Sequence, residues 1–350
     1  MMARMLRVVI RTDASSEIGL GHAMRCLSLA EALCGAGHCV VLASAVMPTA
    51  VERRYDALGV KAMMLSVEIG SRDDATQTAA LARDSKADWL IADGYHFHRA
   101  WQTIVRAAGP RLLMLDDEAI RSEWDADVIL NPNPGTPSDA YVQSAPRTLV
   151  LAGSPYALLR SEFAAWRSWP RPIPLLARNV LVTLGGADPA NHTAHLMNAL
   201  QGATDLTVRV IIGATNPHLE ALRAITRGES ERDSHFSLLT HVEDMPSQMA
   251  WADVAISAGG TTLWELAAMR LPALVVQLAD NQRNRLKAYV EAGAAWSLGV
   301  ADTLQMLQVH RLATALCDDD TTRLRMSRAA SRLVDGGGAE RVRGLMESWQ

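Results

Sequence analysis

The chain has 350 residues, 49% of them hydrophobic and 21% charged, a composition typical of a globular protein with enough material for two domains. Its net charge of −4 leaves no large basic field, so we expect no nucleic-acid partner. The apolar run near the N-terminus is too short for a signal peptide, and no uncharged apolar stretch is long enough to span a membrane. We therefore expect a cytoplasmic protein whose partner is a small molecule.

The four cysteines, Cys26, Cys34, Cys39 and Cys317, show no Cys-x-x-Cys spacing and no neighbouring histidine cluster. This pattern favours reduced thiols over disulfides or a zinc site.

Short apolar runs alternate with helical patterns along the whole chain. The strands expected in the first half are residues 6–10, 39–43, 89–92, 112–115 and 128–130. Those expected in the second half are residues 180–183, 206–212, 237–239, 254–256, 273–276 and 295–297. Helical patterns cover residues 24–33, 74–84, 191–200, 263–269 and 283–291, and the chain is helical again after residue 302. Continuous apolar strands alternating with helices predict parallel sheets in an α/β fold.

A break falls at residues 163–178, which hold three prolines within five positions and no helical or strand period. This composition indicates an extended linker. It divides the chain into a first domain at residues 1–162 and a second at 179–350. We expect two Rossmann-like domains facing a central cleft, with ligands at the carboxyl ends of their strands.

The connection after the first strand contains Gly19, Gly21, His22 and Arg25. A helix beginning near His22 would present free N–H groups and a partial positive charge, which attract phosphate. Histidine titrates near neutral pH, so this pattern predicts a general base beside an anion site. A capping or structural histidine is the alternative.

Two glycine pairs follow strands in the second half. Gly185 and Gly186 would let backbone N–H groups approach a phosphate, unless they form an ordinary strand–helix turn. The segment from Ser257 to Glu265 is the better candidate for a diphosphate site at a helix start. Its expected ligand contacts are Ser257, Gly259, Gly260, Thr261 and Thr262, with Glu265 accepting hydrogen bonds from a sugar hydroxyl pair. The alternative is a threonine cap with Glu265 as its capping-box partner.

Three further groups of polar residues follow strands. Asn281 and Gln282 suit an uncharged polar ligand such as a sugar, with a loop and helix cap as the alternative. Asp93-Gly94-Tyr95 ends one strand, and Tyr95 is a candidate substrate contact. Asp116 and Asp117 end another strand, where aspartates often cap the next helix. Their role is left open.

The run from Arg11 to Ala30, with the pattern RxDASxxIGxGHxxRCLxLA, resembles the UDP-sugar hydrolases of pseudaminic acid biosynthesis. These enzymes act on UDP-2,4-diacetamido-2,4,6-trideoxy-β-L-altropyranose. The similarity continues through residues 93–95, 115–117, 156–163, 184–188, 257–265 and 281–282 and into residues 335–342.

The resemblance implies the two-domain GT-B fold and hydrolysis of a UDP-sugar. It implies that His22 is the general base and that Tyr95 is a tyrosine of the cleft. It places Glu265 on the ribose, Gly259–Thr262 at the diphosphate and Asn281 on the sugar nucleotide.

Hydrolysis needs little more than one base here, because a diphosphate leaves readily without a strong general acid. We expect no cofactor and no metal, and the two Asp-x-Asp patterns, at Asp125–Asp127 and Asp318–Asp320, read as solvated acidic turns. A glycosyltransferase, a UDP-sugar 2-epimerase or a non-catalytic UDP-sugar-binding protein are the alternatives. Release of UDP without an acceptor separates hydrolysis from transfer and from binding alone.

Overall fold

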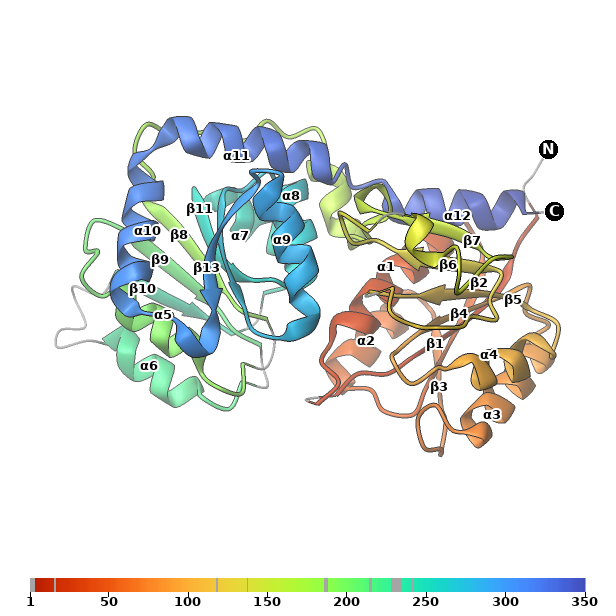
Figure 1. The fold of residues 1–350 in the computed structure, drawn as a ribbon. Coiled ribbons are helices and arrows are strands. Elements are labelled where there is room, and N and C mark those ends of the chain that lie inside the picture. The colour runs from red at the N-terminus through yellow and green to blue at the C-terminus, as the bar shows by residue number, and fades with distance from the viewer. Residues whose placement is uncertain are drawn as a thin grey trace. The chain divides into compact units, whose positions relative to one another are not determined.

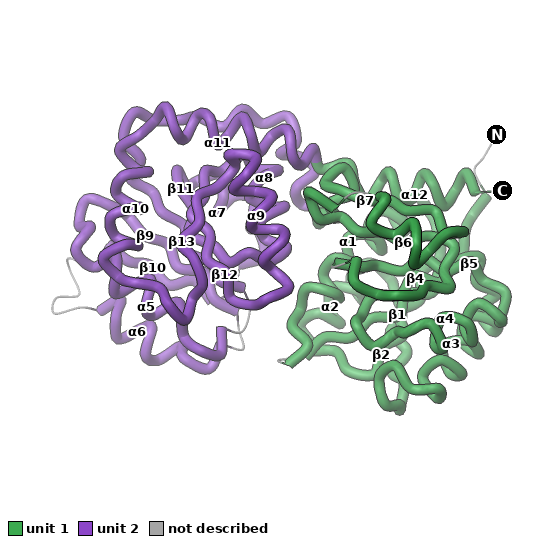
Figure 2. Tube along the Cα trace, in the orientation of Figure 1, with its two compact units in different colours: residues 1–161, 336–350 green, residues 162–335 purple. Residues whose placement is uncertain are grey.

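The computed structural model describes residues 4–15, 17–117, 119–136, 138–185, 188–213, 216–227, 235–240 and 242–349. The chain divides into two compact units, shown in different colours in Figure 2. Unit 1 comprises Met1–Ser161 with Gly336–Gln350, and unit 2 comprises Glu162–Asp335. Each unit is built on a parallel sheet of its own.

Unit 1 contains a seven-stranded parallel sheet in the order β3-β2-β1-β4-β5-β6-β7 (Figure 1). Its strands are β1 (Arg7–Thr12), β2 (Cys39–Ser44), β3 (Lys61–Met64), β4 (Trp89–Asp93), β5 (Arg111–Leu115), β6 (Val128–Asn131) and β7 (Leu149–Ala152). Its helices are α1 (Gly21–Gly35), α2 (Thr49–Ala57), α3 (Arg72–Asp84), α4 (Arg99–Arg106) and α12 (Gly338–Ser348), with short 3₁₀ turns η1 (Ser138–Tyr141) and η2 (Ser154–Tyr156).

Both faces of this sheet are covered, as the apolar strands predict. Val8 and Ile10 of β1 pack in one core with residues of α1, α2 and α12. Val9, between them, points to the other face and packs in a second core with residues of α3 and α4. This alternation follows from the two-residue period of a strand.

Unit 2 contains a six-stranded parallel sheet in the order β10-β9-β8-β11-β12-β13. Its strands are β8 (Asn179–Thr183), β9 (Thr207–Ile211), β10 (Phe236–Leu239), β11 (Val254–Ala258), β12 (Ala273–Gln277) and β13 (Ala295–Val300). Its helices are α5 (His192–Leu200), α6 (Leu219–Arg227), α7 (Met245–Trp251), α8 (Thr262–Ala268), α9 (Arg283–Glu291), α10 (Met306–Asp318) and α11 (Asp320–Leu333), with 3₁₀ turns η4 (Asp280–Gln282) and η5 (Ala301–Thr303). The 3₁₀ turn η3 (Ser161–Trp166) spans the boundary between the units.

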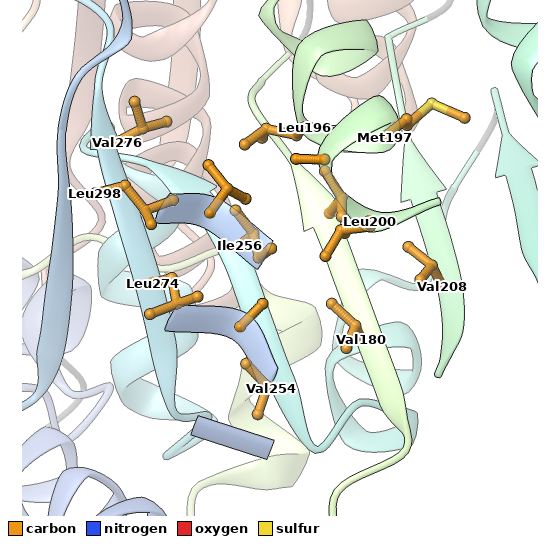
Figure 3. Packing of buried hydrophobic residues seen from close by; sticks show 14 of the residues in the cluster. Val180, Leu196, Met197, Leu200, Val208, Val254, Ile256, Leu274, Val276 and Leu298 are labelled. Atoms are coloured by element: carbon orange, nitrogen blue, oxygen red, sulfur yellow. The ribbon is translucent and has the colours of Figure 1, made fainter. Parts of the chain in front are cut away.

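Figure 3 shows a hydrophobic core of unit 2 from close by. Alternate residues of neighbouring strands, such as Val180, Ile256 and Leu274, pack against Leu196 and Leu200 of α5. Burial of this continuous apolar face stabilises the unit and fixes the register of its strands.

In each sheet the strand order reverses direction once, and candidate site residues follow the strands at that point. In unit 1 the reversal lies between β1 and β4, where Thr12 is paired in register with Asp93. In unit 2 it lies between β8 and β11, where Thr183 is paired with Ser257. Ligands of open α/β sheets bind at the carboxyl ends of strands beside such reversals.

All eleven expected strands are present, and the expected helices are confirmed. The sequence interpretation missed β3 and β7 and the helices α2, α4, α6 and α7.

The last helix corrects the expected domain boundary, because α12 packs in unit 1 rather than in the second domain. A side chain on Gly338 would lie 2.2 Å from the carbonyl oxygen of Ala157, so only glycine allows this close approach. Glu347 of α12 accepts a hydrogen bond from His38 at 2.9 Å. The ring of Trp349 meets the ring of Trp89 edge to face.

The proline-rich stretch is a second correction, because it is docked on unit 2 rather than extended as a free linker. The guanidinium of Arg171 donates to the backbone carbonyls of Met249, Ala252 and Met269 at 2.6–2.7 Å. Burial lowers the pKa of Arg171 to about 9. Arg323 donates in the same way to the carbonyls of Pro174 and Leu175. Arg171 thus bonds carbonyls near the C-terminal ends of α7 and α8, and Arg323 bonds carbonyls of the proline-rich stretch itself.

Candidate active site

The connection between β1 and α1 is held by its own polar side chains. The carboxylate of Asp13 accepts from the backbone N–H of Ala45 at 2.7 Å and forms an ion pair with Arg11 at 2.6 Å. Ser15 Oγ accepts from the N–H groups that follow it, and its carbonyl accepts from Gly19. Gly19 has φ +83°, a conformation that favours glycine. The loop therefore delivers α1 in a fixed position.

The N-terminus of α1 has no side-chain cap, because Leu20 occupies the cap position. A side chain placed on Gly19 or Gly21 would meet nothing within 4 Å, so the backbone there is open. Uncapped N–H groups at a helix start are suited to an anion or a polar ligand.

His22 lies against the end of β4. Its Nδ1 is 2.7 Å from Oδ1 of Asp93, and only 9% of the His22 side chain is exposed. Nδ1 is also 3.2 Å from a guanidinium nitrogen of Arg25. Because that nitrogen is a donor and Asp93 Oδ1 is an acceptor, the shorter contact assigns the Nδ1 proton to the hydrogen bond with Asp93. The lone pair of neutral His22 is then on Nε2, as a general base requires.

Arg25 is locked between two carboxylates. Its Nε and one terminal nitrogen donate to Asp93 at 2.5 and 2.6 Å, and its other terminal nitrogen donates to Asp117 at 2.6 Å. The residue is only 4% exposed. The expectation that Arg25 binds a ligand anion is therefore wrong: all three guanidinium nitrogens serve the cluster around His22.

The cluster beside His22 contains one cation, Arg25, and two carboxylates, Asp93 and Asp117. Burial disfavours the charged form of Asp93, but the charges of Arg25 and His22 outweigh it and hold the pKa of that carboxyl well below its usual range. With Arg25 positive and Asp93 and Asp117 negative, the group carries a net charge of −1 before His22 is counted.

Cys26 lies beside the cluster, with Sγ 3.7 Å from Asp93. Burial, followed by the charge of Asp93, raises the pKa of this thiol well above its ordinary value. Cys26 is thus a packing residue rather than a nucleophile.

Tyr95 and Asp117 extend the cluster. The hydroxyl of Tyr95 donates to Asp117 Oδ2 at 3.0 Å, and its ring meets the His22 ring edge to face at a centroid distance of 4.9 Å. Asn133 donates to the backbone carbonyl of Asp117 at 2.9 Å. Asp117, which the sequence left without a role, therefore joins Arg25 to Tyr95.

Asp116, its neighbour, has a different set of partners. It accepts from the hydroxyl of Tyr141 at 2.6 Å and from the N–H of Ala119 at 2.8 Å. Tyr141 in turn accepts from Asn131 at 2.8 Å and is only 1% exposed. This second aspartate–tyrosine pair is a buried support for the loops after β5 and β6.

The start of α8 in unit 2 has no side-chain cap. Thr261 occupies the cap position and makes no side-chain cap hydrogen bond, so it does not act as the threonine of a capping box. Gly260, Thr261 and Thr262 are partly exposed there. The open N–H groups remain suited to a phosphate.

Gln282 supports this loop. A side chain on Gly259 would lie 3.1 Å from Cβ of Gln282, and Gln282 Oε1 accepts from the N–H of Leu278 at 2.9 Å. Gln282, which was expected to contact the sugar, thus uses its amide oxygen to brace the loop after β12. Arg285, which the sequence interpretation missed, also supports Gly259 by donating to its carbonyl at 3.2 Å.

Ser257 is a further correction. It is fully buried in β11, and its Oγ finds no hydrogen-bond partner among the described residues. A side chain covered in this way does not face a ligand. Glu265 on α8 is half-buried and Asn281 in η4 is exposed, so both keep the access that their expected roles require.

The turn after β8 is organised by Asp188. Its two carboxylate oxygens accept from the N–H groups of His192 and Thr193 at 2.9 and 2.8 Å. The Asp188 carboxylate thus supplies the negative charge that the N-terminus of α5 attracts. Gly185 has φ +103°, which accounts for glycine at that position, and Gly186 lies outside the described residues.

The acidic patterns are structural, and the first is not simply solvated. Asp125 and Asp127 both form ion pairs with Arg106, and Asp127 also accepts from the N–H of Leu112. Asp319 caps α11 by accepting from the N–H of Thr322 at 2.8 Å. No set of three or more His, Cys, Asp or Glu side chains in the described ranges is arranged to hold a metal ion. Within the same ranges, every helix is too short or too polar to cross a membrane.

Residues 179–341 match the glycosyltransferase family 28 C-terminal domain. Over 98% of its length the chain is similar to the crystal structure of MurG from Acinetobacter baumannii, with a TM-score of 0.68 at 18% identity and 99% of that chain covered. It is also similar to MnaA of S. aureus, solved with UDP, with a TM-score of 0.65 at 14% identity over 99% of this chain and 97% of that one. The chain is a GT-B-fold protein.

Two curated proteins are similar to this GT-B protein in sequence. The spore coat polysaccharide biosynthesis protein SpsG of Bacillus subtilis is 28% identical over 245 residues, 68% of this chain and 69% of that protein. The UDP-2,4-diacetamido-2,4,6-trideoxy-β-L-altropyranose hydrolase of Campylobacter jejuni is 23% identical over 225 residues, 63% of this chain and 75% of that protein.

Proposed function

We propose that this protein hydrolyses UDP-2,4-diacetamido-2,4,6-trideoxy-β-L-altropyranose to UDP and the free sugar, a step of pseudaminic acid biosynthesis. The observation that carries the proposal is the pairing of His22 Nδ1 with Asp93 at 2.7 Å, which leaves Nε2 as the base. The similarity to the Campylobacter jejuni hydrolase supports the choice of substrate.

In this reaction the oxygen of a water molecule attacks the anomeric carbon as the bond from that carbon to the diphosphate oxygen breaks. The bonding electrons leave with UDP, and the configuration at the anomeric carbon inverts. Nε2 of His22 takes the proton of the water. The imidazolium keeps its Nδ1 hydrogen bond to Asp93, and the net charge of the cluster falls to zero. A positioned base of this kind contributes about 10²–10⁴-fold to the rate.

Unit 2 is proposed to bind the UDP portion. The N–H of Gly259 donates to the carbonyl of Val276 at 3.1 Å. Within the expected segment Gly259–Thr262, the N–H groups from Gly260 to Thr262 at the start of α8 therefore suit the diphosphate, and their partial positive charge would stabilise it as it leaves. Glu265 is placed one turn further along α8, where a carboxylate can accept from the ribose hydroxyls. Asn281 remains the proposed contact to the sugar nucleotide, and neither a cofactor nor a metal has a role.

The experiment is incubation of the purified protein with the UDP-sugar in ¹⁸O-water, without an acceptor and with a chelator. UDP and free sugar are followed over time, and mass spectrometry locates the label. Label in the sugar supports metal-independent hydrolysis with cleavage of the carbon–oxygen bond. Label in UDP would exclude attack at the anomeric carbon.

A glycosyltransferase is the second candidate, because residues 179–341 match a glycosyltransferase domain. The same His22 base would then deprotonate an acceptor hydroxyl rather than water. UDP release that depends on an added acceptor would favour this reading, as would transfer of the amino sugar to that acceptor.

A further inference from the structure

The connection after β1 is hydrogen-bonded to the connection after β2. Asp13 Oδ1 accepts from the backbone N–H groups of Ala45 and Val46, at 2.7 and 3.3 Å. The N–H of Ala14 donates in return to the carbonyl of Val46 at 2.9 Å. These bonds continue the parallel pairing of β1 with β2 beyond the ends of the two strands. The segment that leads to His22 is therefore fastened to a neighbouring loop.

A second bond joins the helices that follow these two connections. The hydroxyl of Tyr55 on α2, a fully buried residue, donates to the carbonyl of Ala23 in the first turn of α1 at 2.9 Å. Between the two anchors the loop is closed on itself, because the carbonyl of Ser15 accepts from the N–H of Gly19. Two residues then separate this closed loop from His22. Any displacement of the loop is therefore passed on to the start of α1.

Both oxygens of Asp13 are used as acceptors. Oδ2 lies 2.6 Å from a guanidinium nitrogen of Arg11 in an ion pair, and Oδ1 also accepts from the hydroxyl of Ser44 at 3.1 Å. Asp13 is only 4% exposed and Arg11 is fully buried. Burial by itself would lower the pKa of Arg11, but Asp74 and Asp13 outweigh it and raise that pKa, so the guanidinium stays charged. A buried ion pair is weak evidence of net stability, whereas the bonds of this carboxylate specify where the loop lies.

We propose that Asp13 is a positioning residue for the His22 base and holds the start of α1 where Nδ1 of His22 reaches Asp93. This inference rests on the proposed function, in which neutral His22 takes a proton from water at Nε2. Within the described part of the chain, the partners of Asp13 lie in β1, β2 and the connection after β2. Asp13 therefore acts through the backbone rather than on the substrate. The 2.7 Å contact between His22 and Asp93 depends on the position of α1, and a displacement of about 1 Å can cost about 10²-fold in rate.

Asp74 provides a matched control in the same ion network. It is fully buried and accepts from Arg11 through both oxygens, at 3.0 and 2.8 Å. It also accepts from the N–H of Gly70, before α3, and from the hydroxyl of Thr78, within α3. Asp74 thus resembles Asp13 in charge, burial and ion-pair partner, but it holds the connection before α3 instead of the one before α1.

Asp13→Asn and Asp74→Asn test the inference. An amide has one acceptor oxygen, whereas each of these carboxylates accepts through both oxygens, so either substitution places an N–H group against a donor. We expect both variants to have a lower melting temperature. Only Asp13→Asn is expected to lower kcat, about 10- to 100-fold, with the dissociation constant for UDP unchanged.

The measurement that separates positioning from stability is the tautomer of His22. In protein with ¹⁵N-labelled imidazoles, NMR spectra at a pH where imidazoles are neutral distinguish an Nδ1–H ring from an Nε2–H ring. The chain has ten histidines, so the His22 signals are assigned by their absence from His22→Asn. We expect the Nδ1–H form in the wild type and in Asp74→Asn. Asp13→Asn is expected to show a mixture of both forms, because Nδ1 no longer reaches Asp93.

Ser44→Ala covers the case in which Asp13→Asn does not fold. It removes a hydroxyl that lies 3.1 Å from Asp13 Oδ1 and 3.0 Å from the carbonyl oxygen of Val46, and it leaves both charges in place. We expect a smaller shift of the His22 tautomer in the same direction. The control is Thr78→Val, which removes a hydroxyl bonded to Asp74 at 3.1 Å and should leave the tautomer unchanged.

The outcomes separate this inference from the proposed function. An Nδ1–H form unchanged in Asp13→Asn, or in Ser44→Ala where Asp13→Asn does not fold, would overturn the inference whatever the activity. An equal loss of that form in Asp74→Asn would also overturn it, because the network would then support the whole unit rather than the base. If the wild-type protein releases no UDP while the tautomer still responds to Asp13→Asn, the proposed function fails and the positioning of His22 by Asp13 stands.

Discussion

The connection after β1 in unit 1 and the connection after β11 in unit 2 each lie beside the strand reversal of their own sheet, but they present different chemistry. The first leads to a buried cluster of ionisable groups, in which His22, Arg25, Asp93 and Asp117 satisfy one another. The second leads to glycines and threonines at an uncapped helix start. Side chains provide the chemistry in one case, and backbone N–H groups provide it in the other.

This difference suits the two ends of a nucleotide sugar. A proton-transfer step needs a base whose tautomer and charge are fixed, and that requires buried partners. A diphosphate carries its own charge and needs only well-placed donors. In our proposal, unit 1 therefore acts on a neutral group and unit 2 holds an anion.

The comparison is tested most severely by His22→Asn. The asparagine amide can still donate to Asp93, so the cluster stays intact, but no basic nitrogen remains. We expect turnover to fall about 10²–10⁴-fold, with UDP affinity nearly unchanged, as measured by UDP release and by titration. Retention of more than about a tenth of the wild-type rate would remove His22 as the base.

The control for this variant is His38→Asn. His38 is also a buried histidine paired with a carboxylate, Glu347 on α12. It lies in unit 1 but outside the cluster, so the substitution should lower stability and leave kcat within about twofold.

Asp93→Asn tests whether the cluster serves catalysis or only stability. Removing one partner of a buried ion pair costs about 3–5 kcal/mol of stability, and losing the group that orients His22 should lower kcat about 10- to 100-fold. The matched control is Asp74→Asn, which breaks the buried pair with Arg11, bonded at 3.0 and 2.8 Å. We expect the two variants to lose about the same melting temperature, whereas only Asp93→Asn should lose kcat. The kcat values are measured well below the melting temperatures of both variants. Equal kcat in the two variants would make Asp93 a structural residue.

The sequence predicted the sheets well because their central strands are continuous apolar runs. It missed β3 (Lys61–Met64) and β7 (Leu149–Ala152), which are the two edge strands of unit 1; β3 is largely exposed and β7 is partly exposed. An edge strand has only one neighbour and less surface to bury, and both of these strands are only four residues long, too short to show a clear strand pattern. The placement of α12 in unit 1 was missed for a different reason, because it depends on contacts with residues near Ala157 that no local pattern shows.

The site was predicted only in part. His22 and Tyr95 were named from local motifs, but the pairing of His22 with Asp93 spans 71 positions in the sequence. The signal available was that His22 follows β1 and Asp93 ends β4, because parallel pairing of these strands brings their carboxyl ends to one edge of the sheet. Arg25 shows the opposite failure, since a cation at a helix start looks like an anion site until its two carboxylate partners are known.

A smaller effect is expected for Glu265→Ala, which sharpens the role of unit 2. If the carboxylate accepts from the ribose, UDP affinity should fall about tenfold, since a hydrogen bond to a charged group contributes about 1.5–3 kcal/mol. The control is Glu220→Ala, which removes an acidic residue from the first turn of α6. Titration with UDP gives the answer, and an affinity unchanged in Glu265→Ala would remove that residue from the site.

The smallest effect should come from Asp188→Ala, which asks whether the turn after β8 binds phosphate or only caps α5. Both carboxylate oxygens accept from N–H groups at the start of α5, so their loss should cost about 0.5–2 kcal/mol of stability. Asp244→Ala, which removes the cap of α7, is the matched control and should cost a similar amount. UDP affinity should stay within about twofold in both variants, because the Asp188 carboxylate already fills the place of an anion. If UDP affinity changed in Asp188→Ala but not in Asp244→Ala, the turn at Gly185 would be part of the diphosphate site. The loops after β8 and after β11, the two strands at the reversal of unit 2, would then both bind the ligand.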